Sequence, residues 1–434
     1  MKFGKGWGRL GMTSEWQVKP LGDIVSVVID YRGKTPKKLG GDWSIQGTRA
    51  LSAKNIKTRE IVQPETIRFV DVDMYKSWMK EEIQRGDILI TSEAPFGEVF
   101  YWDSDEKIVL SQRLFAVRCK KEFYSPFIFQ YMTSEQFQGE LRGRSTGTTV
   151  TGLRQPELLK CLVAFPDYKE QVAIADTLSA LDARIAENRA INNHLEQIAQ
   201  AIFKSWFVDF EPFEGVMPDE WREGTFSDVI SATIGGDWGK DTPSGNNTQE
   251  AYCVRGADIP DVNAGNKGKM PIRYILPKNY AVKQLTVGNI VVEISGGSPT
   301  QSTGRCALIT QSLLDRYDRG MVCTNFCRAV RPLAGYSPFV YFYWKYLYAQ
   351  NVMFSYENGT TGIKNLDISG FLKTEPIIIP PVDVAHQFTE AVGMLIDTVF
   401  ANGLENETLA MTRDSLLPRL MSGELSVTDL GDAK

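Results

Sequence analysis

One pattern constrains the fold of this chain more than any other: a ladder of residues spaced alternately by four and three occurs twice. The first ladder comprises Ile174, Leu178, Leu181, Ile185, Asn188, Asn192, Leu195, Ala199, Ile202 and Trp206. The second, 214 residues later, comprises Phe388, Val392, Leu395, Val399, Asn402, Asn406, Leu409, Arg413, Leu416 and Leu420. This spacing places side chains along one seam of a helix, so two long helices and two similar halves are predicted.

Two asparagines occupy matching rungs of each ladder: Asn188 and Asn192 in the first, Asn402 and Asn406 in the second. We call these four residues the seam asparagines. An asparagine at such a seam usually sets the register of the pair. If the helices pair antiparallel, Asn188 falls close to Asn406 and Asn192 close to Asn402. We therefore expect two polar layers at the centre of the pair.

The repeat continues into the segments that precede the helices. Gly86-Asp87-Ile88-Leu89 matches Gly288-Asn289-Ile290-Val291, and Phe115-Ala116-Val117-Arg118 resembles Arg328-Ala329-Val330-Arg331. Short β-branched runs bounded by Gly, Asp or Pro predict strands in both segments. We predict an α+β chain with an internal pseudo-two-fold repeat, in which two long antiparallel helices separate two strand-rich α/β domains. The predicted limits are 1–166 for the first domain, 167–212 for the central helix, 213–381 for the second domain, and 382–434 for the last helix and tail.

Local signals mark the ends of both helices. Asp167 is a plausible N-cap of the first helix, with Glu170 at capping-box spacing. In the second helix, Gly393 and Gly403 are expected to weaken the structure, and Pro418 to bend or end it.

Composition and charge are those of a globular chain with an uneven charge distribution. The 434 residues carry a net charge of −5. Residues 1–166 hold 25 basic and 20 acidic residues, and residues 213–381 hold 16 of each, so the net negative charge of the chain lies in the helical segments. We expect a cytoplasmic protein, because no run approaches the ~18 apolar residues of a membrane helix and the amino terminus lacks the apolar stretch of a signal peptide.

Catalytic signatures are missing from the sequence. Gly33-Lys34-Thr35 lacks the earlier glycine of a phosphate-binding loop, and no G-x-S-x-G elbow occurs. Only two histidines are present, and no second pair completes a zinc set with Cys323 and Cys327. We therefore predict neither a metal site nor an active site in this chain.

Polar and basic loops are the best candidates for binding, and nucleic acid is the ligand that they suit, because Arg and Asn side chains can read base edges. Such loops are more often solvated turns when they are considered singly. The candidates are Arg32, Lys34, Thr35, Lys37, Arg142, Arg144, Thr148, Thr149, Trp238, Lys240, Thr360, Thr361, Lys364 and Asn365.

Several runs resemble the specificity subunits of type I restriction–modification enzymes. They are Glu15-Trp16, Tyr31-Arg32-Gly33-Lys34-Thr35-Pro36, Gly86-Asp87-Ile88-Leu89-Ile90-Thr91, Ala201-Ile202-Phe203-Lys204-Ser205-Trp206-Phe207-Val208-Asp209-Phe210 and Pro418-Arg419-Leu420-Met421-Ser422-Gly423-Glu424-Leu425. The run around Trp206 is the most specific of them.

The resemblance implies that each variable domain is a target-recognition domain that reads one part of a split, asymmetric DNA sequence. It also implies that the paired helices form a coiled-coil spacer that docks partner subunits, namely two adenine methyltransferase (modification) subunits and restriction–translocase subunits. S-adenosylmethionine, ATP and magnesium would then be bound by those partners, with no cofactor in this chain. A helix of ~38 residues spans ~57 Å, which is enough to hold two reading heads one DNA turn, ~34 Å, apart.

Two other interpretations stay open at this point. One is a coiled-coil scaffold whose two β-rich heads bind proteins, and the other is an enzyme with an unrecognised site.

Overall fold

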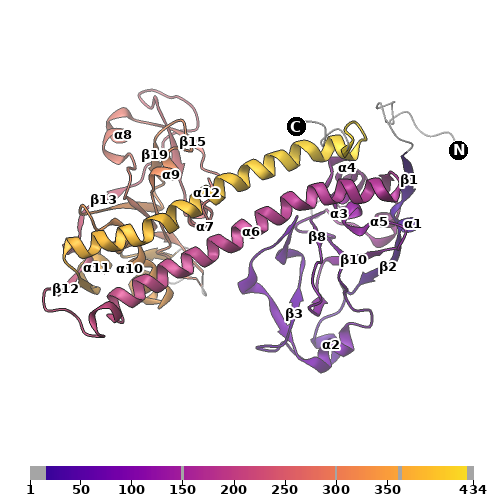
Figure 1. Cartoon of the computed structure of the whole chain (residues 1–434), viewed down its shortest axis with the longest axis horizontal. Coiled ribbons are helices and arrows are strands. Elements are labelled where there is room, and N and C mark those ends of the chain that lie inside the picture. Colours follow the sequence, from indigo (N-terminus) through magenta and orange to yellow (C-terminus); the bar gives the residue numbers. More distant parts are fainter. Residues whose placement is uncertain (1–15, 148–150, 299–300, 360–363, 428–434) are drawn as a thin grey trace. The chain divides into compact units, whose positions relative to one another are not determined.

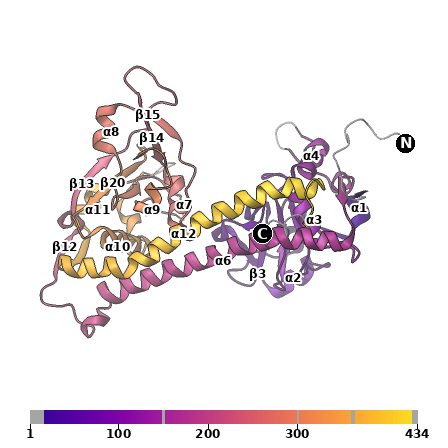
Figure 2. The same ribbon diagram turned by 45° about the horizontal axis from the view of Figure 1, so that its top comes forward.

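The computed structural model describes residues 16–147, 151–298, 301–359 and 364–427. Backbone contacts divide the chain into two compact units. Unit 1 consists of Met1–Arg184 together with Leu409–Lys434, and unit 2 is the continuous stretch Ile185–Thr408. Each unit therefore contains one strand-rich domain and one end of each long helix (Figures 1 and 2).

Unit 1 contains a four-stranded sheet with the strand order β2-β10-β7-β8, a three-stranded sheet β6-β3-β9, and the pairs β1-β11 and β4-β5. Its strands are β1 (Gln17–Pro20), β2 (Val25–Asp30), β3 (Thr48–Leu51), β4 (Ile56–Lys57), β5 (Glu60–Ile61), β6 (Arg68–Val70), β7 (Ile88–Thr91), β8 (Val99–Tyr101), β9 (Ile108–Leu110), β10 (Leu114–Cys119) and β11 (Leu162–Phe165). Its shorter helices are α1 (Leu21–Ile24), α2 (Val72–Trp78), α3 (Ser125–Thr133), α4 (Glu135–Arg144) and α5 (Gln155–Leu159).

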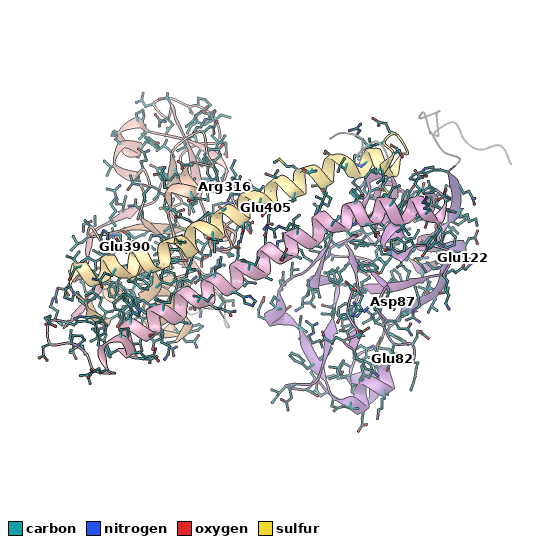
Figure 3. The ribbon with its side chains drawn as sticks, viewed as in Figure 1. Glu82, Asp87, Glu122, Arg316, Glu390 and Glu405 are labelled. Atoms are coloured by element: carbon teal, nitrogen blue, oxygen red, sulfur yellow. The ribbon has the colours of Figure 1, made fainter. Side chains whose placement is uncertain are left out.

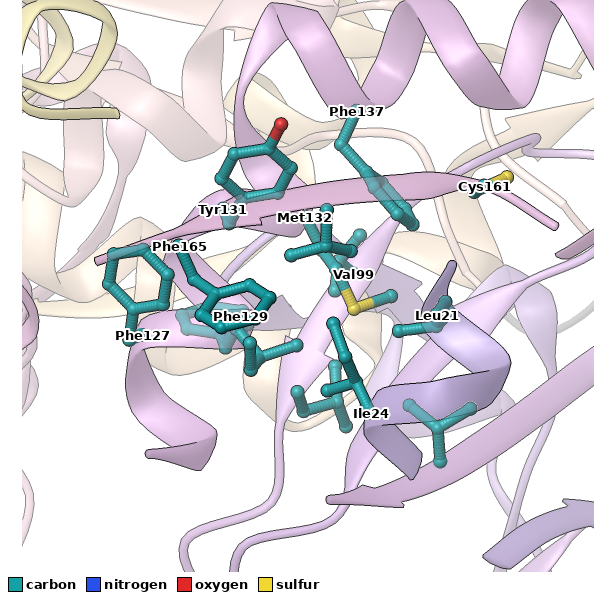
Figure 4. Packing of buried hydrophobic residues seen from close by; sticks show 14 of the residues in the cluster. Leu21, Ile24, Val99, Phe127, Phe129, Tyr131, Met132, Phe137, Cys161 and Phe165 are labelled. Carbon is teal, nitrogen blue, oxygen red and sulfur yellow. The ribbon is translucent and has the colours of Figure 1, made fainter. Parts of the chain in front are cut away.

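Both faces of the four-stranded sheet are buried. Successive residues of a strand point to opposite faces, so they pack into different cores. Ile88, Ile90 and Phe115 pack into one hydrophobic core, and Leu89 and Leu114 into another. The first core is completed by side chains from α1, α3 and α4 (Figure 4). Strands that are covered on both faces have continuous apolar sequences, and β7, β9 and β10 have sequences of this kind.

Unit 2 repeats this arrangement: β13-β20-β16-β18 corresponds to the four-stranded sheet, β15-β14-β19 to the three-stranded sheet, and β12-β23 to the terminal pair. Its strands are β12 (Arg222–Thr225), β13 (Ile230–Gly235), β14 (Gln249–Val254), β15 (Ile272–Ile275), β16 (Ile290–Glu293), β17 (Ser295–Gly296), β18 (Cys306–Leu308), β19 (Met321–Cys323), β20 (Cys327–Pro332), β21 (Glu357–Asn358), β22 (Lys364–Leu366) and β23 (Pro376–Ile379). Its shorter helices are α7 (Ile259–Asn263), α8 (Pro277–Lys283), α9 (Gln311–Leu314), α10 (Ser337–Ala349) and α11 (Ile368–Thr374).

The repeat extends to single hydrogen bonds. The Asp87 carboxylate accepts from the backbone N–H of Gln84 at 2.9 Å, and the Asn289 carboxamide oxygen accepts from that of Thr286 at 3.0 Å. The Asp87 carboxylate is buried and also pairs with Arg118 at 2.8 Å (Figure 3). The matched Gly-Asp and Gly-Asn runs thus close the same turn before β7 and β16.

The two long helices, α6 (Tyr168–Phe207) and α12 (Val382–Met421), have 40 residues each. α6 is capped as predicted, because the Asp167 carboxylate accepts from the backbone N–H of Glu170 at 3.0 Å. Pro418 does not end the second helix at its own position, since α12 continues for three more residues to Met421; a bend at Pro418 stays a prediction. Pro418 lies within the last turn, where few intrahelical hydrogen bonds depend on it.

The helices run antiparallel in both units, and all the residues of the two ladders are buried or half-buried. In unit 2, the Asn188 carboxamide donates to Asn406 at 3.0 Å and that of Asn402 donates to Asn192 at 2.8 Å. These are the two pairs expected for antiparallel seam asparagines. Asn188 also donates to Glu405, labelled in Figure 3, at 2.8 Å.

Gly403 is a contact point, which corrects the expectation that it only weakens α12. A Cβ on Gly403 would lie 1.8 Å from the backbone oxygen of Gly265, in the loop after α7. The Asn192 carboxamide donates to the backbone oxygens of Ala264 at 3.1 Å and Val399 at 3.0 Å. The glycine thus lets the α7 loop rest directly on the paired helices of unit 2.

In unit 1, the seam contains an ionic cluster around Asp182. Its carboxylate pairs with Arg59 at 3.0 Å and with Arg413 at 2.8 Å, and it accepts from Gln130 at 3.0 Å. Arg413, the charged rung of the second ladder, therefore joins α12 to α6 and to the loop that carries Arg59.

Candidate nucleic-acid interface

A three-residue turn, Ser111–Arg113, links β9 to β10 in unit 1; we call it tip 1. Ser111 and Leu114 are buried, whereas Gln112 and Arg113 between them are exposed. The backbone holds tip 1 at both ends, because the N–H of Ser111 donates to Leu51 at 2.7 Å and the oxygen of Arg113 accepts from Ser92 at 2.9 Å. Two polar side chains are thus held outward on a fixed backbone.

A hollow of about 330 Å³ lies beside tip 1, and Gln112 and Arg113 form part of its wall. Trp43, Lys54 and Arg68 line it as well, with the Arg68 guanidinium 5.1 Å from the Trp43 ring. A second hollow, lined by Asp30, Arg32, Gly33 and Glu93, shares Gln112 and Arg113 with the first. Tip 1 therefore separates two polar depressions.

The charge in the first hollow is positive and little compensated. Among the residues that the structure describes, Lys54 and Arg68 make no ion pair with an acid, and both are exposed. Arg113 has a loose partner in Glu93, with Nε and Oε2 3.6 Å apart, and an exposed pair of this kind contributes little. Lysine and arginine can bind phosphates here, while a carboxamide and a guanidinium can address base edges.

Unit 2 has the same turn at the corresponding place, Thr324–Phe326, between β19 and β20; we call it tip 2. Thr324 and Cys327 are buried, and Asn325 and Phe326 are exposed. The N–H of Thr324 donates to Val254 at 2.9 Å, and the oxygen of Phe326 accepts from Ile294 at 2.9 Å. The backbone is therefore held as in tip 1, while the two exposed side chains differ in kind.

Comparison with known proteins finds relatives whose similarity extends over most of this chain. Residues 13–197 match the family described as the type I restriction modification DNA specificity domain. The specificity subunit of the type I restriction enzyme MjaIX of Methanocaldococcus jannaschii is 25% identical, with 96% of this chain and 95% of that protein covered. The specificity subunit of the HindI enzyme of Haemophilus influenzae is 26% identical over 80% of this chain and 88% of that protein. Over most of its length, this chain is therefore similar to type I specificity subunits.

A solved structure shares the fold of this chain. The crystal structure of the S subunit of a type I restriction–modification system from M. genitalium superposes with a TM-score of 0.53 at 17% identity, covering 95% of this chain and 97% of that one.

Two of the predicted binding residues of this chain have partners inside its first domain. The Arg32 guanidinium pairs with Asp30 at 2.8 Å, donates to the backbone oxygen of Leu153 at 3.1 Å and lies 3.8 Å from the Phe115 ring centre. The Lys34 ammonium donates to the backbone oxygen of Trp78 at 2.8 Å, and burial lowers its pKa. Asp30 therefore balances the charge of Arg32, and the Lys34 ammonium already has a hydrogen-bond acceptor within the domain.

The other predicted residues of the first domain lie on different elements. Thr35 is half-buried and its hydroxyl accepts from the backbone N–H of Lys38 at 3.3 Å, whereas Lys37 is exposed. On α4, Arg142 pairs with Glu135 and Arg144 with Glu140. Thr148 and Thr149 lie outside the described residues.

In the second domain, Trp238 is 38% exposed and stacks 4.1 Å above the guanidinium of buried Arg273. Lys240 is exposed beside it. On β22, Lys364 pairs with Glu357 at 2.7 Å, and Asn365 accepts a hydrogen bond from Ser295. Thr360 and Thr361 lie outside the described residues. Contact between any of these residues and DNA stays a prediction.

The sequence interpretation missed both tips, although one signal pointed to them. The match of Phe115-Ala116-Val117-Arg118 with Arg328-Ala329-Val330-Arg331 continues backwards without a gap, so that tip 1 aligns with tip 2. Gln112-Arg113 in the first half and Asn325-Phe326 in the second stand at the same place in this alignment, and the two pairs differ from each other. Each pair lies between two apolar runs. Such an interruption marks a turn between two buried strands.

Five of the six cysteines are buried and Cys119 is half-buried, and none forms a disulfide among the described residues. Burial raises the pKa of the Cys161, Cys306 and Cys323 thiols to about 12 and that of Cys327 to about 11. We call these four the buried thiols. Within the described ranges, no three His, Cys, Asp or Glu residues are grouped as metal ligands, and no helix is long and apolar enough to span a bilayer.

Proposed function

We propose that the chain recognises a bipartite, asymmetric double-stranded DNA sequence and directs partner methyltransferase and restriction subunits to it. The observation that carries the proposal is the repeat of one fold in two units, each with a fixed turn whose exposed side chains differ. Two copies of one scaffold with different tips suit the reading of two different half-sites. On this proposal, residues 1–166 and 213–381 are the target-recognition domains, and residues 167–212 and 382–434 form the spacer.

The distribution of charge supports this division of labour. The helical segments 167–212 and 382–434 hold 17 acidic and 7 basic residues, whereas segment 1–166 has an excess of basic ones. DNA phosphates repel acidic surfaces and attract basic ones. The helices are thus better suited to contacts with protein partners, and the strand-rich domains to contacts with DNA.

Methylation of adenine and cleavage of DNA belong, on this proposal, to two modification subunits and to restriction subunits that assemble with the chain in the cytoplasm. S-adenosylmethionine, ATP and magnesium would be bound by those partners, and this chain would hold no cofactor. The relatives carry the name specificity subunit, which describes recognition rather than catalysis.

The test is long-read mapping of methylated adenine in cells that express the chain with its cognate modification subunit, compared with cells that lack the chain. A split motif with a fixed gap that depends on the chain is the expected result. Replacement of residues 1–166 by the same segment of another specificity subunit should change one half of the motif only. If no motif depends on the chain while its partner is expressed, the proposal fails and the protein-binding scaffold becomes the better interpretation.

A further inference from the structure

We infer that tip 1 and tip 2 are the base-reading elements of the two units, with Gln112 and Arg113 reading one half-site and Asn325 and Phe326 the other. This inference rests on the proposed function and adds to it the residues that determine specificity. Three features carry it: the fixed backbone of the tips, the backbone conformation of Arg113, and the identity of the exposed side chains.

A side chain can discriminate between bases only if its position is fixed before binding. Each tip meets this requirement, since it follows a fully buried strand, β9 or β19, of one sheet and leads into an interior strand, β10 or β20, of another. In tip 1 the oxygen of Gln112 also accepts from the N–H of Ala53 at 3.1 Å. Ala53 begins a short 3-10 turn whose last residue, Asn55, is buried. The Asn55 carboxamide oxygen accepts from the Ser52 N–H at 3.1 Å.

Unit 2 has an equivalent 3-10 turn at the corresponding place in the chain. Residues Gly256–Asp258 follow β14 as residues Ala53–Asn55 follow β3. The buried carboxylate of Asp258 accepts from the N–H of Arg255 at 3.0 Å, in the place of the Asn55 carboxamide. The 3-10 turn is therefore repeated in the two halves, while the exposed residues of the tips differ.

Arg113 has a left-handed backbone conformation, with φ of +62°. A non-glycine residue in this region is held there at a cost, and glycine would adopt the conformation freely. The carbonyl of Arg113 is held by Ser92, whose own oxygen accepts from Leu153 at 3.0 Å. The position favours glycine for folding, so the presence of an arginine points to a use for its side chain.

The exposed side chains indicate which bases each tip can read. Among the described residues, the carboxamides of Gln112 and Asn325 form no hydrogen bond, so both are available to the paired acceptor and donor of adenine. Arg113 suits the two acceptors of guanine in the major groove. Phe326, which is 61% exposed, has no polar atom on its side chain and suits the 5-methyl group of thymine.

Lys54 and Arg68 have a different role in this arrangement. They lie across the hollow from tip 1, and their cations suit phosphate oxygens, which carry no sequence information. Their removal should weaken binding to all sequences equally, whereas a change in tip 1 should alter the preference at single positions.

The test maps methylated adenine, as above, in cells that express variants of the chain with the cognate modification subunit. Arg113→Gly removes the side chain and relieves the backbone, and Phe326→Ala removes the ring from tip 2. The matched controls are Lys121→Ala and Leu333→Ala, because both residues are exposed and lie just beyond the opposite ends of β10 and β20. Arg113→Lys keeps the charge but loses the two-pronged donor, so it serves as a second variant of the same position.

We expect Arg113→Gly to unfold at the same temperature as the parent or higher, and to lose preference at one position of the half-site that depends on residues 1–166. Discrimination at that position should fall about 10- to 100-fold, with the other half-site unchanged. Phe326→Ala should relax one position of the other half-site, and both controls should keep the parental motif.

Three results would overturn the inference. Parental motifs in Arg113→Gly, Arg113→Lys and Phe326→Ala would show that the tips do not read bases, and they would leave the proposed function intact. Simultaneous relaxation of both half-sites by one variant would contradict the assignment of one tip to each half-site. The absence of a parental motif would defeat the proposed function, and this inference with it.

Discussion

Gly403 offers a sharp test of the packing in unit 2, because substitution by alanine has two opposing effects there. In an exposed helix interior, replacing glycine by alanine stabilises the helix by about 1 kcal/mol. At Gly403, however, the new Cβ would lie 1.8 Å from the backbone oxygen of Gly265, where atoms need about 3 Å. The loop and α12 must therefore separate by roughly 1 Å.

The cost of this separation can be worked from its neighbours. Overpacking of a rigid site costs about 1–3 kcal/mol. The hydrogen bond from Asn192 to Ala264 and that from Asn402 to Asn192 span the same junction, and each lost bond adds about 1 kcal/mol. After the gain in helix propensity is subtracted, Gly403→Ala should lower the free energy of unfolding by about 2–4 kcal/mol.

The assay is thermal and urea-induced unfolding of the purified chain, followed by circular dichroism. A domain of this size loses about 2–4 °C in melting temperature per kcal/mol, so Gly403→Ala should melt roughly 4–16 °C lower. The matched control is Gly393→Ala on the same helix, where a Cβ meets nothing within 4 Å and a small stabilisation is expected. Equal or higher stability of Gly403→Ala would refute the close approach of the α7 loop to α12.

Three further predictions concern the seam and the cysteines. Asp182→Ala leaves the half-buried Arg59 and Arg413 without their shared carboxylate and should destabilise unit 1 by about 3 kcal/mol in urea unfolding, whereas Asp414→Ala, at the exposed end of the cluster, should cost under about 1 kcal/mol. Replacement of all four seam asparagines by leucine should raise the melting temperature but permit register slippage, which would appear as several cysteine cross-linked species in place of one; a single species would contradict their role in register. Because their folded-state pKa values are raised to about 11–12, the buried thiols should stay neutral at pH 9 and react with a thiol reagent only on unfolding. Their contribution to stability is complete below the unfolded-state pKa near 9 and is lost as the pH rises towards 12, so the melting temperature should fall over that range; rapid labelling of the folded chain at pH 8 would contradict this.

The long helices and the pairing of the seam asparagines could be predicted because both depend on local spacing. An antiparallel pair with one apolar seam has few degrees of freedom once the ladder is known. The same reasoning misjudged Gly403 as a weakness, since the reason for that glycine lies in a loop more than a hundred residues away in sequence. Tertiary contacts of this kind leave no periodic trace.

The binding residues were harder to predict for an electrostatic reason. Lys364 stands out in sequence as a basic loop residue, yet Glu357 pairs with it across a β-hairpin. Arg32 is likewise balanced by Asp30. In contrast, Gln112 and Arg113 look unremarkable within an apolar run, and only the paired strands on either side make them protrude. Whether a basic side chain is available to a ligand depends on which acidic side chains pair with it in the folded chain, and sequence alone does not determine those pairs.

The composition of unit 1 has a consequence for the synthesis of the chain. Leu417, Leu420 and Met421 belong to the same hydrophobic core as Leu21 and Phe127, so the first unit contains the last helical turns of the polypeptide. When translation has reached Thr408, all of unit 2 has been synthesised, while the amino-terminal unit still lacks part of its core. The unit that is translated first is therefore completed last, and a message truncated near its end would release a chain with a finished second unit and an unfinished first one.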